Sequence, residues 1–445
     1  MRLLPLYLLV MLVAAACERP FVPPIEPAIT IVEPSDPDVL RFRPFVEVRV
    51  KASSFRNISR VEIDGIPAEF DSLNGNWQTV VTLSPGVNEL QVTAFDIEES
   101  AGTRTLRMAY IDPRYVDDAP ALPAPWRLGG HTATLLNDGS VLVTGGAPGE
   151  FQEAVARAFL LPPEGTEFEL LPATMSTPRY GHTATLLPDG RVLIIGGSTS
   201  GAILRVDEIV DTAEIYDPAT REFTEVTFEG APLQRAEHAT FVSRSPTSLL
   251  IDIFGGLGED PVSGSNSLST LASIQSYRFE NNTLTTFTSF SDSQLLPAYG
   301  MASTLVSDPA TEGDGMGRYV ITGASFLESG PRNTNFSIDF AQAPIRVTIL
   351  NDFLTSRIQH ASAALEPGIV AIFGGFQGVR QSATSSAEIF IETSNRFSTL
   401  DSQISTRRRF SHTATKLSGE RILILGGFSA SGQAISESLY FEWGL

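Results

Sequence analysis

The sequence predicts an all-β protein with two folded domains behind an N-terminal leader. Three observations support this prediction. The chain has 445 residues, among them 36 glycines and 29 prolines, and this composition suits short strands joined by turns. Apolar and polar residues alternate in short runs, as they do in half-buried strands. A segment that ends in a glycine pair recurs along the C-terminal three quarters of the chain, which indicates repeated structural units.

The composition also excludes one class of partner. Acidic residues outnumber basic residues by 51 to 31, so the formal net charge is −20. Such a surface repels phosphate backbones, and we therefore expect no nucleic-acid partner. Apolar residues make up 42% of the chain and charged residues only 18%, enough to build a sizeable core.

Residues 1–16 have the features of a secretory signal: Arg2, an apolar stretch and small residues before Cys17. The stretch is shorter than the roughly 20 apolar residues of a membrane span. It resembles a bacterial lipoprotein signal, which implies that Cys17 is lipidated. Cys17 is the only cysteine in the sequence, so an internal disulfide is excluded. Ala14 and Ala16 also fit ordinary signal cleavage, and simple secretion is the alternative.

Residues 17–27 are rich in proline and lack strand alternation, so we expect an extended tether there. Together with the signal, this predicts a protein of the bacterial cell envelope that touches a membrane only through an N-terminal lipid. The outer membrane or the cell surface is favoured over the inner membrane.

Residues 28–112 are predicted to form a small β-sandwich, because short alternating runs are bounded by Pro, Gly, Asn, Asp or Ser. The segment 85–100, PGVNELQVTAFDIEES, resembles the penultimate hairpin of bacterial immunoglobulin-like domains. The resemblance implies an immunoglobulin-like fold, with Trp77 in its core. We expect this module to act as a rigid spacer, and a binding domain is the alternative.

Residues 113–445 contain six copies of one repeat. Each copy ends in a glycine pair except the fourth, which has Ala324 in place of the second glycine. The copies span residues 129–146, 180–197, 237–256, 299–324, 359–375 and 410–427. A period near 50 residues with a terminal Gly-Gly resembles the kelch repeat, whose unit is a four-stranded propeller blade. The resemblance implies a six-bladed kelch-type β-propeller similar to the central domain of galactose oxidase.

The strands of each blade can be assigned from the repeat. HTATLL is expected to be the innermost strand, and VLVTGG or VLIIGG the second, buried on both faces. Residues 212–218 and 386–392 are expected to be third strands, and 222–228 and 396–402 fourth strands. The sixth copy reaches only its third strand before Leu445, so the segment 115–126 is expected to pair with it and close the ring.

Two residue types recur at fixed places in the repeat. A histidine begins five of the six innermost strands, namely His131, His182, His238, His360 and His412, with Met301 in the fourth copy. Ligands of one zinc ion must lie about 2 Å from it, whereas six blades hold these histidines apart. We therefore expect one structural hydrogen bond per blade and no metal or other cofactor. Arginines stand three residues before four of the histidines, at Arg179, Arg235, Arg357 and Arg409. They are predicted to bind a partner's anionic group near the axial mouth, and local pairing with acidic residues is the alternative.

No catalytic residue is assigned. The copper-radical chemistry of galactose oxidase needs a cysteine crosslinked to tyrosine, and Cys17 alone cannot supply it. The sequence also lacks an Asp-box, G-x-S-x-G, a Walker loop and HExxH. We expect a non-catalytic, monomeric binding protein that recognises a protein or a glycan. A carbohydrate-active propeller enzyme is the alternative.

Overall fold

A computed structural model describes most of the chain, and the predicted signal, Cys17 and most of the tether lie outside the described residues. The residues that the structure describes are 26–35, 41–203, 205–230, 232–245, 248–259, 267–290, 297–306, 317–326, 330–332, 335–340, 345–352, 355–377, 382–400 and 408–444. The chain divides into two compact units, residues 1–110 and 111–445. In the described ranges the structure is all-β apart from the 3-10 turn Val206–Glu208, which confirms the predicted fold class.

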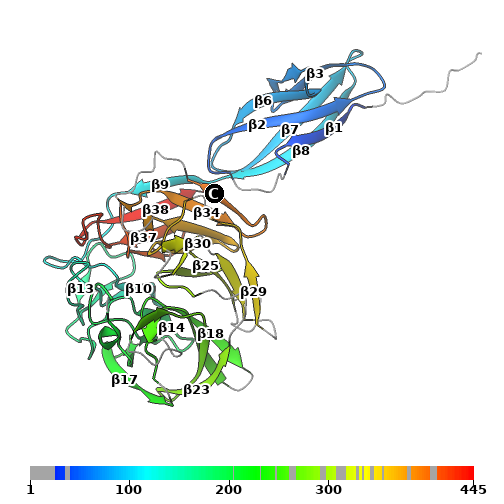
Figure 1. The fold of residues 1–445 in the computed structure, drawn as a ribbon. Coiled ribbons are helices and arrows are strands. Elements are labelled where there is room, and N and C mark those ends of the chain that lie inside the picture. Colours follow the sequence, from blue (N-terminus) through cyan, green and yellow to red (C-terminus); the bar gives the residue numbers. More distant parts are fainter. Residues whose placement is uncertain are drawn as a thin grey trace, which may run out of the picture. The chain divides into compact units, whose positions relative to one another are not determined.

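The first unit contains two four-stranded antiparallel sheets (Figure 1). One has the order β1 (Ala28–Glu33), β2 (Phe45–Ser53), β6 (Asn76–Thr82), β5 (Glu69–Asp71). The other has the order β4 (Ile66–Pro67), β3 (Ile58–Ile63), β7 (Gly86–Asp96), β8 (Ala101–Tyr110). Alternate residues of both sheets, such as Val48, Val61 and Val92, form one buried cluster. Trp77 packs against this cluster only in part, with its ring 5.1 Å from that of Phe70.

The second unit is a ring of six four-stranded blades in the part of the chain that the structure describes. Blade 1 holds β10 (Thr132–Leu135), β11 (Val141–Thr144), β12 (Ala158–Leu161) and β13 (Glu169–Leu170), and blade 2 holds β14 (Thr183–Leu186), β15 (Val192–Ile195), β16 (Ala213–Asp217) and β17 (Glu222–Glu229). Blade 3 holds β18 (Ala239–Ser245), β19 (Ser248–Phe254), β22 (Ile274–Glu280) and β23 (Thr283–Phe290), and blade 4 holds β24 (Ala302–Leu305), β25 (Arg318–Thr322), β28 (Phe336–Asp339) and β29 (Arg346–Ile349). Blade 5 holds β30 (Ala361–Glu366), β31 (Ile369–Phe373), β34 (Ala387–Ile391) and β35 (Arg396–Thr399). Blade 6 holds β36 (Thr413–Lys416), β37 (Arg421–Leu425), β38 (Ser438–Gly444) and β9 (Asp112–Val116).

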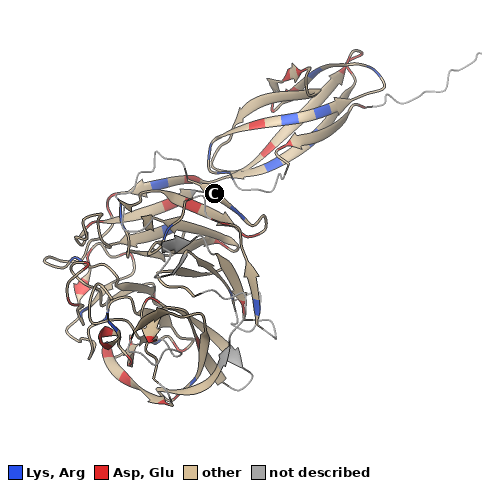
Figure 2. Ribbon diagram, viewed as in Figure 1, with Lys and Arg blue, Asp and Glu red and all other residues tan. Residues whose placement is uncertain are grey.

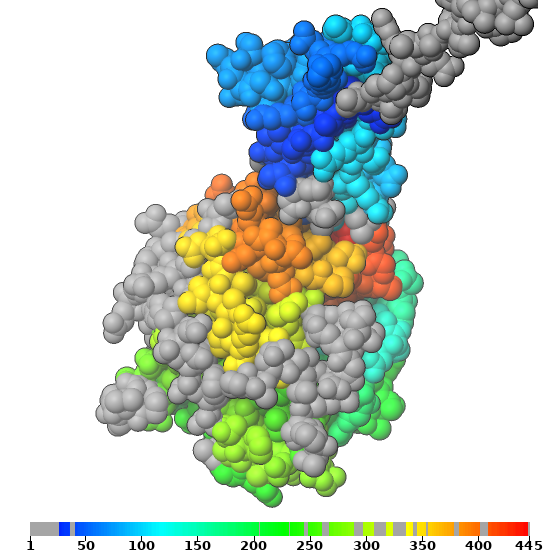
Figure 3. All heavy atoms as spheres, turned by 90° about the vertical axis from the view of Figure 1, so that its right-hand side faces the viewer, coloured from blue at the N-terminus to red at the C-terminus, as the bar shows by residue number. Residues whose placement is uncertain are grey.

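The connection between the second and third strands forms a small hairpin in three blades of the described structure. The hairpin strands are β20 (Leu257–Glu259) with β21 (Leu268–Thr270), β26 (Ala324–Phe326) with β27 (Gly330–Arg332), and β32 (Phe376–Gln377) with β33 (Ser382–Ala383). Figure 3 shows blades 3 to 5, coloured green through orange, following one another along one side of the ring.

The inner strands surround the central axis as the repeat predicts. β10 neighbours β14 and β36, and β24 neighbours β30. The second strands β11 and β15 are buried along their whole length, because adjacent blades cover both of their faces. One contact was not predicted: the outer strands β17 and β23 pair in parallel, so blades 2 and 3 form one continuous sheet.

The ring is closed by a strand from before the first repeat, as predicted, but the strand lies earlier than expected. β9 pairs antiparallel with β38, with Tyr115 opposite Phe441, so the closing strand is 112–116 rather than 115–126. Three prolines, Pro120, Pro123 and Pro125, limit the hydrogen bonds that the later part of the predicted segment could donate, whereas β9 has a single proline, Pro113, on an edge strand, where proline is tolerated. The chain beyond Val116 instead offers carbonyls: Ser438 Oγ donates to Ala119 O at 2.9 Å and to Pro120 O at 2.6 Å.

Candidate functional site

The repeated histidines join each blade to the one before it. His182 Nε2 lies 3.0 Å from Thr144 Oγ1 and 3.2 Å from Thr132 Oγ1, both in the preceding blade. The first glycine of that blade's pair, Gly145, has φ +64°, and a Cβ there would lie 2.6 Å from His182 Cε1. The glycine is therefore required both by its backbone conformation and by the approach of the next histidine.

The same contact recurs at three more histidines, so the predicted structural hydrogen bond is present at four of the five histidines. The Nε2···Oγ1 distances are 3.1 Å for His238 and Thr183, 2.8 Å for His360 and Thr322, and 3.2 Å for His131 and Thr413. Blades 1, 2, 4 and 6 have a threonine at one or both of the positions that face the next histidine, whereas blade 5 has Ala361 and Phe373 there. His412 Nε2 accordingly has no hydrogen-bond partner within the described structure. Burial lowers the pKa of His131 to about 4 and that of His238 to about 3, so both are neutral. No group of three or more His, Cys, Asp or Glu that could hold a metal ion occurs among the described residues.

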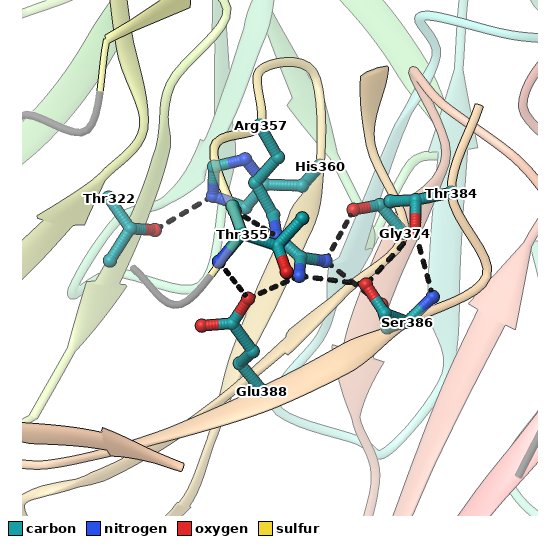
Figure 4. A network of polar contacts seen from close by, with 8 residues as sticks. All are labelled: Thr322, Thr355, Arg357, His360, Gly374, Thr384, Ser386 and Glu388. Atoms are coloured by element: carbon teal, nitrogen blue, oxygen red, sulfur yellow. Dashed lines mark hydrogen bonds and ion pairs between the residues drawn. The ribbon is translucent and has the colours of Figure 1, made fainter. Parts of the chain in front are cut away.

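The four repeated arginines lie inside the blades and not at the axial mouth. Arg357 is fully buried; its Nη1 donates to Gly374 O at 2.8 Å and to Ser386 O at 2.9 Å, and its Nη2 donates to Glu388 Oε1 (Figure 4). This arrangement ties the end of the second strand to the start of the third. We call it the arginine clasp.

The clasp recurs at the other three arginines. Arg179 donates to Gly196 O, Thr212 O and Glu214; Arg235 donates to Gly255 O and Ser273 O; and Arg409 donates to Gly426 O and Glu437 O. Their exposed fractions are 0–5%. The predicted partner-binding role of Arg179, Arg235, Arg357 and Arg409 is not supported by these positions, because the guanidinium groups are enclosed and donate to carbonyls within their own blades. The alternative was local pairing with acidic residues, and two of the arginines form such ion pairs: Arg179 with Glu214, and Arg357 with Glu388.

The central axis holds a different group of polar side chains. A cavity of about 320 Å³ is lined by the inner strands and by the residue that precedes the histidine position in each blade. These six residues are Gly130, Gly181, Glu237, Gly300, Gln359 and Ser411, and all have φ between +50° and +65°. We call them the axial ring. Hydrogen bonds between their backbones link them: Gly130 N to Ser411 O, Gly181 N to Gly130 O, Glu237 N to Gly181 O, Gln359 N to Gly300 O and Ser411 N to Gln359 O, at 2.6–2.9 Å.

Three members of the axial ring are not glycine. Glu237, Gln359 and Ser411 adopt the left-handed conformation with φ of 50–51°, which costs a residue with a side chain on the order of 1 kcal/mol or more. Their side chains converge on the axis from blades 3, 5 and 6. Gln359 Nε2 donates to Glu237 Oε1 at 2.6 Å. Tyr180, from blade 2, donates to the same oxygen at 3.4 Å and lies 3.2 Å from Ser411 Oγ.

The glycines of the axial ring make room for these side chains. A Cβ on Gly300 would lie 3.2 Å from Gln359 Cγ and 3.3 Å from Glu237 Oε2. A Cβ on Gly130 would lie 2.0 Å from the Tyr180 ring. The small and large members of the axial ring are thus complementary, and the polar cluster depends on both.

Glu237 dominates the electrostatics of the axial cavity. Burial raises its pKa to about 7, although hydrogen bonds from Gln359 and Tyr180 act in the opposite direction. Its second oxygen, Oε2, is enclosed and has no hydrogen-bond partner among the residues that the structure describes. The cavity therefore contains one carboxyl group that changes charge near neutral pH and has an unused acceptor.

A second cavity, of about 490 Å³, lies between blades 6 and 1 on the side of the inner hairpin turns. Four of its charged side chains form ion pairs: Arg421 Nη2 lies 2.6 Å from Glu442, and Arg114 Nη2 lies 2.8 Å from Asp112. One polar residue with a left-handed backbone, Glu164 (φ +53°), lines this cavity. Three such residues meet at the axial cavity, which is therefore the stronger candidate.

Sequence reasoning concentrated on the histidines and arginines and missed the axial ring. The signal was present in the alignment of the repeats: the position before the histidine is glycine in three copies and Glu, Gln or Ser in the others. When a repeat position holds glycine in some copies and a polar residue in others, the polar side chain has a role that offsets the backbone strain it causes.

The fold and its repeats define a kelch-type β-propeller. A family model described as the kelch motif matches residues 178–227, which run from the arginine clasp of blade 2 into β17. The chain is similar in fold to the solved structure of YjhT, with 14% identity and a TM-score of 0.57, over 74% of this chain and 99% of that one. None of the curated protein sequences compared with the chain matches it significantly. Within the described residues, no helix is long and apolar enough to cross a membrane.

Proposed function

We propose that this chain is a lipid-anchored protein of the bacterial envelope whose propeller binds a ligand at the axial cavity without catalysis. The observation that carries the proposal is the convergence at the axis of Glu237, Gln359 and Ser411, each in a left-handed conformation. Glu237 and Ser411 contact Tyr180, and Gln359 donates to Glu237. Backbone strain at a cavity wall is typical of functional sites, where the surroundings hold a residue in an unfavourable conformation. The ligand would be a protein or glycan partner that presents hydrogen-bonding groups to the axis.

The carboxyl inventory supports binding over hydrolysis. Most glycosidases use a pair of carboxyl groups on either side of the scissile bond. Glu237 is the one carboxyl group among the described residues that line the axial cavity. A carbohydrate-active enzyme is the second candidate, because a carboxyl with a pKa of about 7 suits general acid–base catalysis.

The first unit would be an immunoglobulin-like spacer. Its strand orders, β1-β2-β6-β5 and β4-β3-β7-β8, correspond to the ABED and C′CFG sheets of immunoglobulin domains when the strands are lettered in chain order. In the resembling hairpin, Asp96 Oδ1 accepts the N–H groups of Glu98 and Ser100 at 2.9 Å, a local bond that shapes the turn before the last strand. The spacer and the proline-rich tether would hold the monomeric propeller away from the membrane.

The anchor is tested by Cys17→Ser. We expect the wild-type protein to enter the detergent phase and the variant to remain in the aqueous phase, because the variant has no thiol to acylate. Equal partitioning of the two would exclude lipidation at Cys17, and secretion after cleavage at Ala16 would then explain the signal.

The axial site is tested by a glycan-array and pull-down screen of the purified protein. Glu237→Gln and Gln359→Ala are the axial variants, and Glu222→Gln, an exposed change of the same charge on β17, is the matched control. We expect ligands of the wild type to be lost by the axial variants and retained by the control. Ligands retained by all three variants would place the binding site elsewhere. Conversion of a bound sugar, followed by NMR, would favour the enzyme.

A further inference from the structure

The hydrogen-bond inventory of the axial cavity is strongly biased toward acceptors. Glu237 Oε2 has no partner among the described residues. The Tyr180 hydroxyl is shared between Glu237 Oε1 and Ser411 Oγ, and one of the two N–H groups of the Gln359 amide donates to Glu237. The carbonyl oxygen of the Gln359 amide and the Ser411 hydroxyl add two more acceptors on the same ring. A ligand that fits this inventory brings its own donors.

Five of the six backbone N–H groups of the axial ring are unavailable to an anion. The N–H groups of Gly130, Gly181, Glu237, Gln359 and Ser411 each donate to the carbonyl of a neighbouring ring member. Oxyanion and phosphate sites in proteins need free, convergent N–H groups. These five N–H groups are already used.

The surrounding charges also favour a cation. Burial keeps the histidines that line the cavity neutral, since it lowers the pKa of His131 to about 4 and that of His238 and His360 to about 3, and lowers those of His182 and His412 well below the ordinary value. The arginines of the clasps donate to strand carbonyls. An ionised Glu237 thus has no cation beside it among the described cavity-lining residues, and the chain as a whole carries a net charge of −20.

The walls restrict the shape of the ligand. Below the axial ring the cavity is lined by the small side chains of the inner strands, among them Ala133, Ala184 and Ser303. A volume of about 320 Å³ with such walls accommodates a slender chain along the axis.

We infer that the axial ring recognises a primary ammonium group carried on a slender alkyl chain, which donates to Glu237 Oε2, Gln359 and Ser411. This inference rests on the proposed axial binding function and names the chemistry of its ligand. A free aliphatic amine and a lysine side chain of a protein partner present the same group. Three N–H donors of an ammonium match three acceptors of the ring, and the ion pair it forms with Glu237 is shielded from solvent.

The test is calorimetric titration of the purified protein with three probes at pH 8. 1,5-Diaminopentane represents the free amine, a lysine peptide blocked at both ends represents the side chain, and 1,5-pentanediol is the uncharged counterpart of the diamine. We expect saturable binding of the diamine or of the peptide and none of the diol. Glu237→Gln should weaken amine binding about ten- to a hundredfold, as expected for loss of a charge-assisted hydrogen bond, and Glu222→Gln should leave it unchanged.

The pH dependence gives an independent readout. Amine binding should be several-fold stronger at pH 8 than at pH 5.5, because Glu237, with its pKa of about 7, is then ionised, whereas Tyr180 and the histidines facing it keep their charge states over this range. Binding of the diol as tightly as the diamine, or full amine affinity in Glu237→Gln, would overturn the inference. If amines fail to bind while Glu237→Gln still abolishes the ligands of the glycan and pull-down screen, the amine is wrong and the axial function stands.

Discussion

The arginine clasp of blade 5 allows the contribution of a buried ion pair to be measured, because some other blades have uncharged residues at the two equivalent positions. Arg357 and Glu388 are both 0% exposed. In blade 1 the two positions are Leu128 and Phe159, and both belong to an apolar cluster. Glu388→Phe alone would leave the Arg357 cation enclosed without its counter-ion. Removing one partner of a buried pair costs about 3–5 kcal/mol, and we expect the free energy of unfolding to fall by that amount.

The double variant Arg357→Leu/Glu388→Phe reproduces the blade 1 pair and removes both charges together. It still leaves Gly374 O and Ser386 O without the donors that Arg357 supplies, so some destabilisation remains. We expect the double variant to be less destabilised than the sum of its single changes, with a coupling of about 2 kcal/mol or more. Glu388→Gln, which imitates Gln275 at the same register in blade 3, should cost only about 1–2 kcal/mol because an amide still accepts a hydrogen bond.

The measurement is urea unfolding followed by fluorescence of Trp126 and Trp443, which both lie in the propeller. Asp207→Ala is the control, since it removes a carboxylate from the exposed pair with Arg205 (66% and 62% exposed) and should cost less than about 1 kcal/mol. Strictly additive effects of the single changes would refute the view that Glu388 serves as a buried counter-ion.

Three further predictions concern closure, the histidines and Glu237. A fragment of residues 111–445 should unfold cooperatively on heating. A fragment of residues 120–445 lacks β9 and exposes the edge of β38, so it should aggregate or melt at a lower temperature. Equal melting temperatures of the two fragments would mean that β9 does not close the ring. At pH 7, His182→Met should lower the free energy of unfolding by about 1–2 kcal/mol more than His412→Met does. The reason is that His182 contacts two threonine hydroxyls, whereas His412 Nε2 contacts none in the described structure. A higher urea midpoint for His182→Met than for His412→Met would contradict this. Folding raises the pKa of Glu237 from 4.5 to about 7, so its contribution to stability is complete below pH 4.5 and is lost as the pH rises through 7. The free energy of unfolding of Glu237→Gln should therefore rise by up to about 3 kcal/mol relative to that of the wild type between pH 4.5 and 8. A difference that stays constant with pH would show that this pKa is unperturbed.

The repeat made the propeller predictable down to single strands. The histidine register, the glycine pairs and the third strands at Ala213–Asp217 and Ala387–Ile391 follow from a pattern written six times. Each position is then constrained by equivalent neighbours, and a substitution in one copy can be compared with the others. The closing strand has no counterpart among the repeats, and its position was predicted three residues too late at its start.

The axial site was not predictable in the same way. Gln359 and Glu237 are 122 residues apart in sequence, and their contact exists only because the ring brings equivalent positions of different blades to one axis. The sequence also did not identify the acidic partners of the arginines. Arg357 and Glu388 are 31 residues apart, and nothing in the sequence distinguishes them from exposed charged residues. The inner strands β10 and β14 carry no charged residue (Figure 2), and the carboxyl group at the axis comes from Glu237, in the loop before the inner strand β18.

The pairing of β9 with β38 has a consequence for the order of events during synthesis. β9 is completed at Val116, and its partner begins at Ser438, so more than 300 residues must be made before the two can meet. The sandwich strands end at Tyr110 and can associate long before that, since domains fold as units while the chain is still growing. The propeller stays an open arc with one unsatisfied edge until the last strand arrives. A chain that stops before β38 would carry that open edge permanently, so closure of the ring requires synthesis to have passed β38.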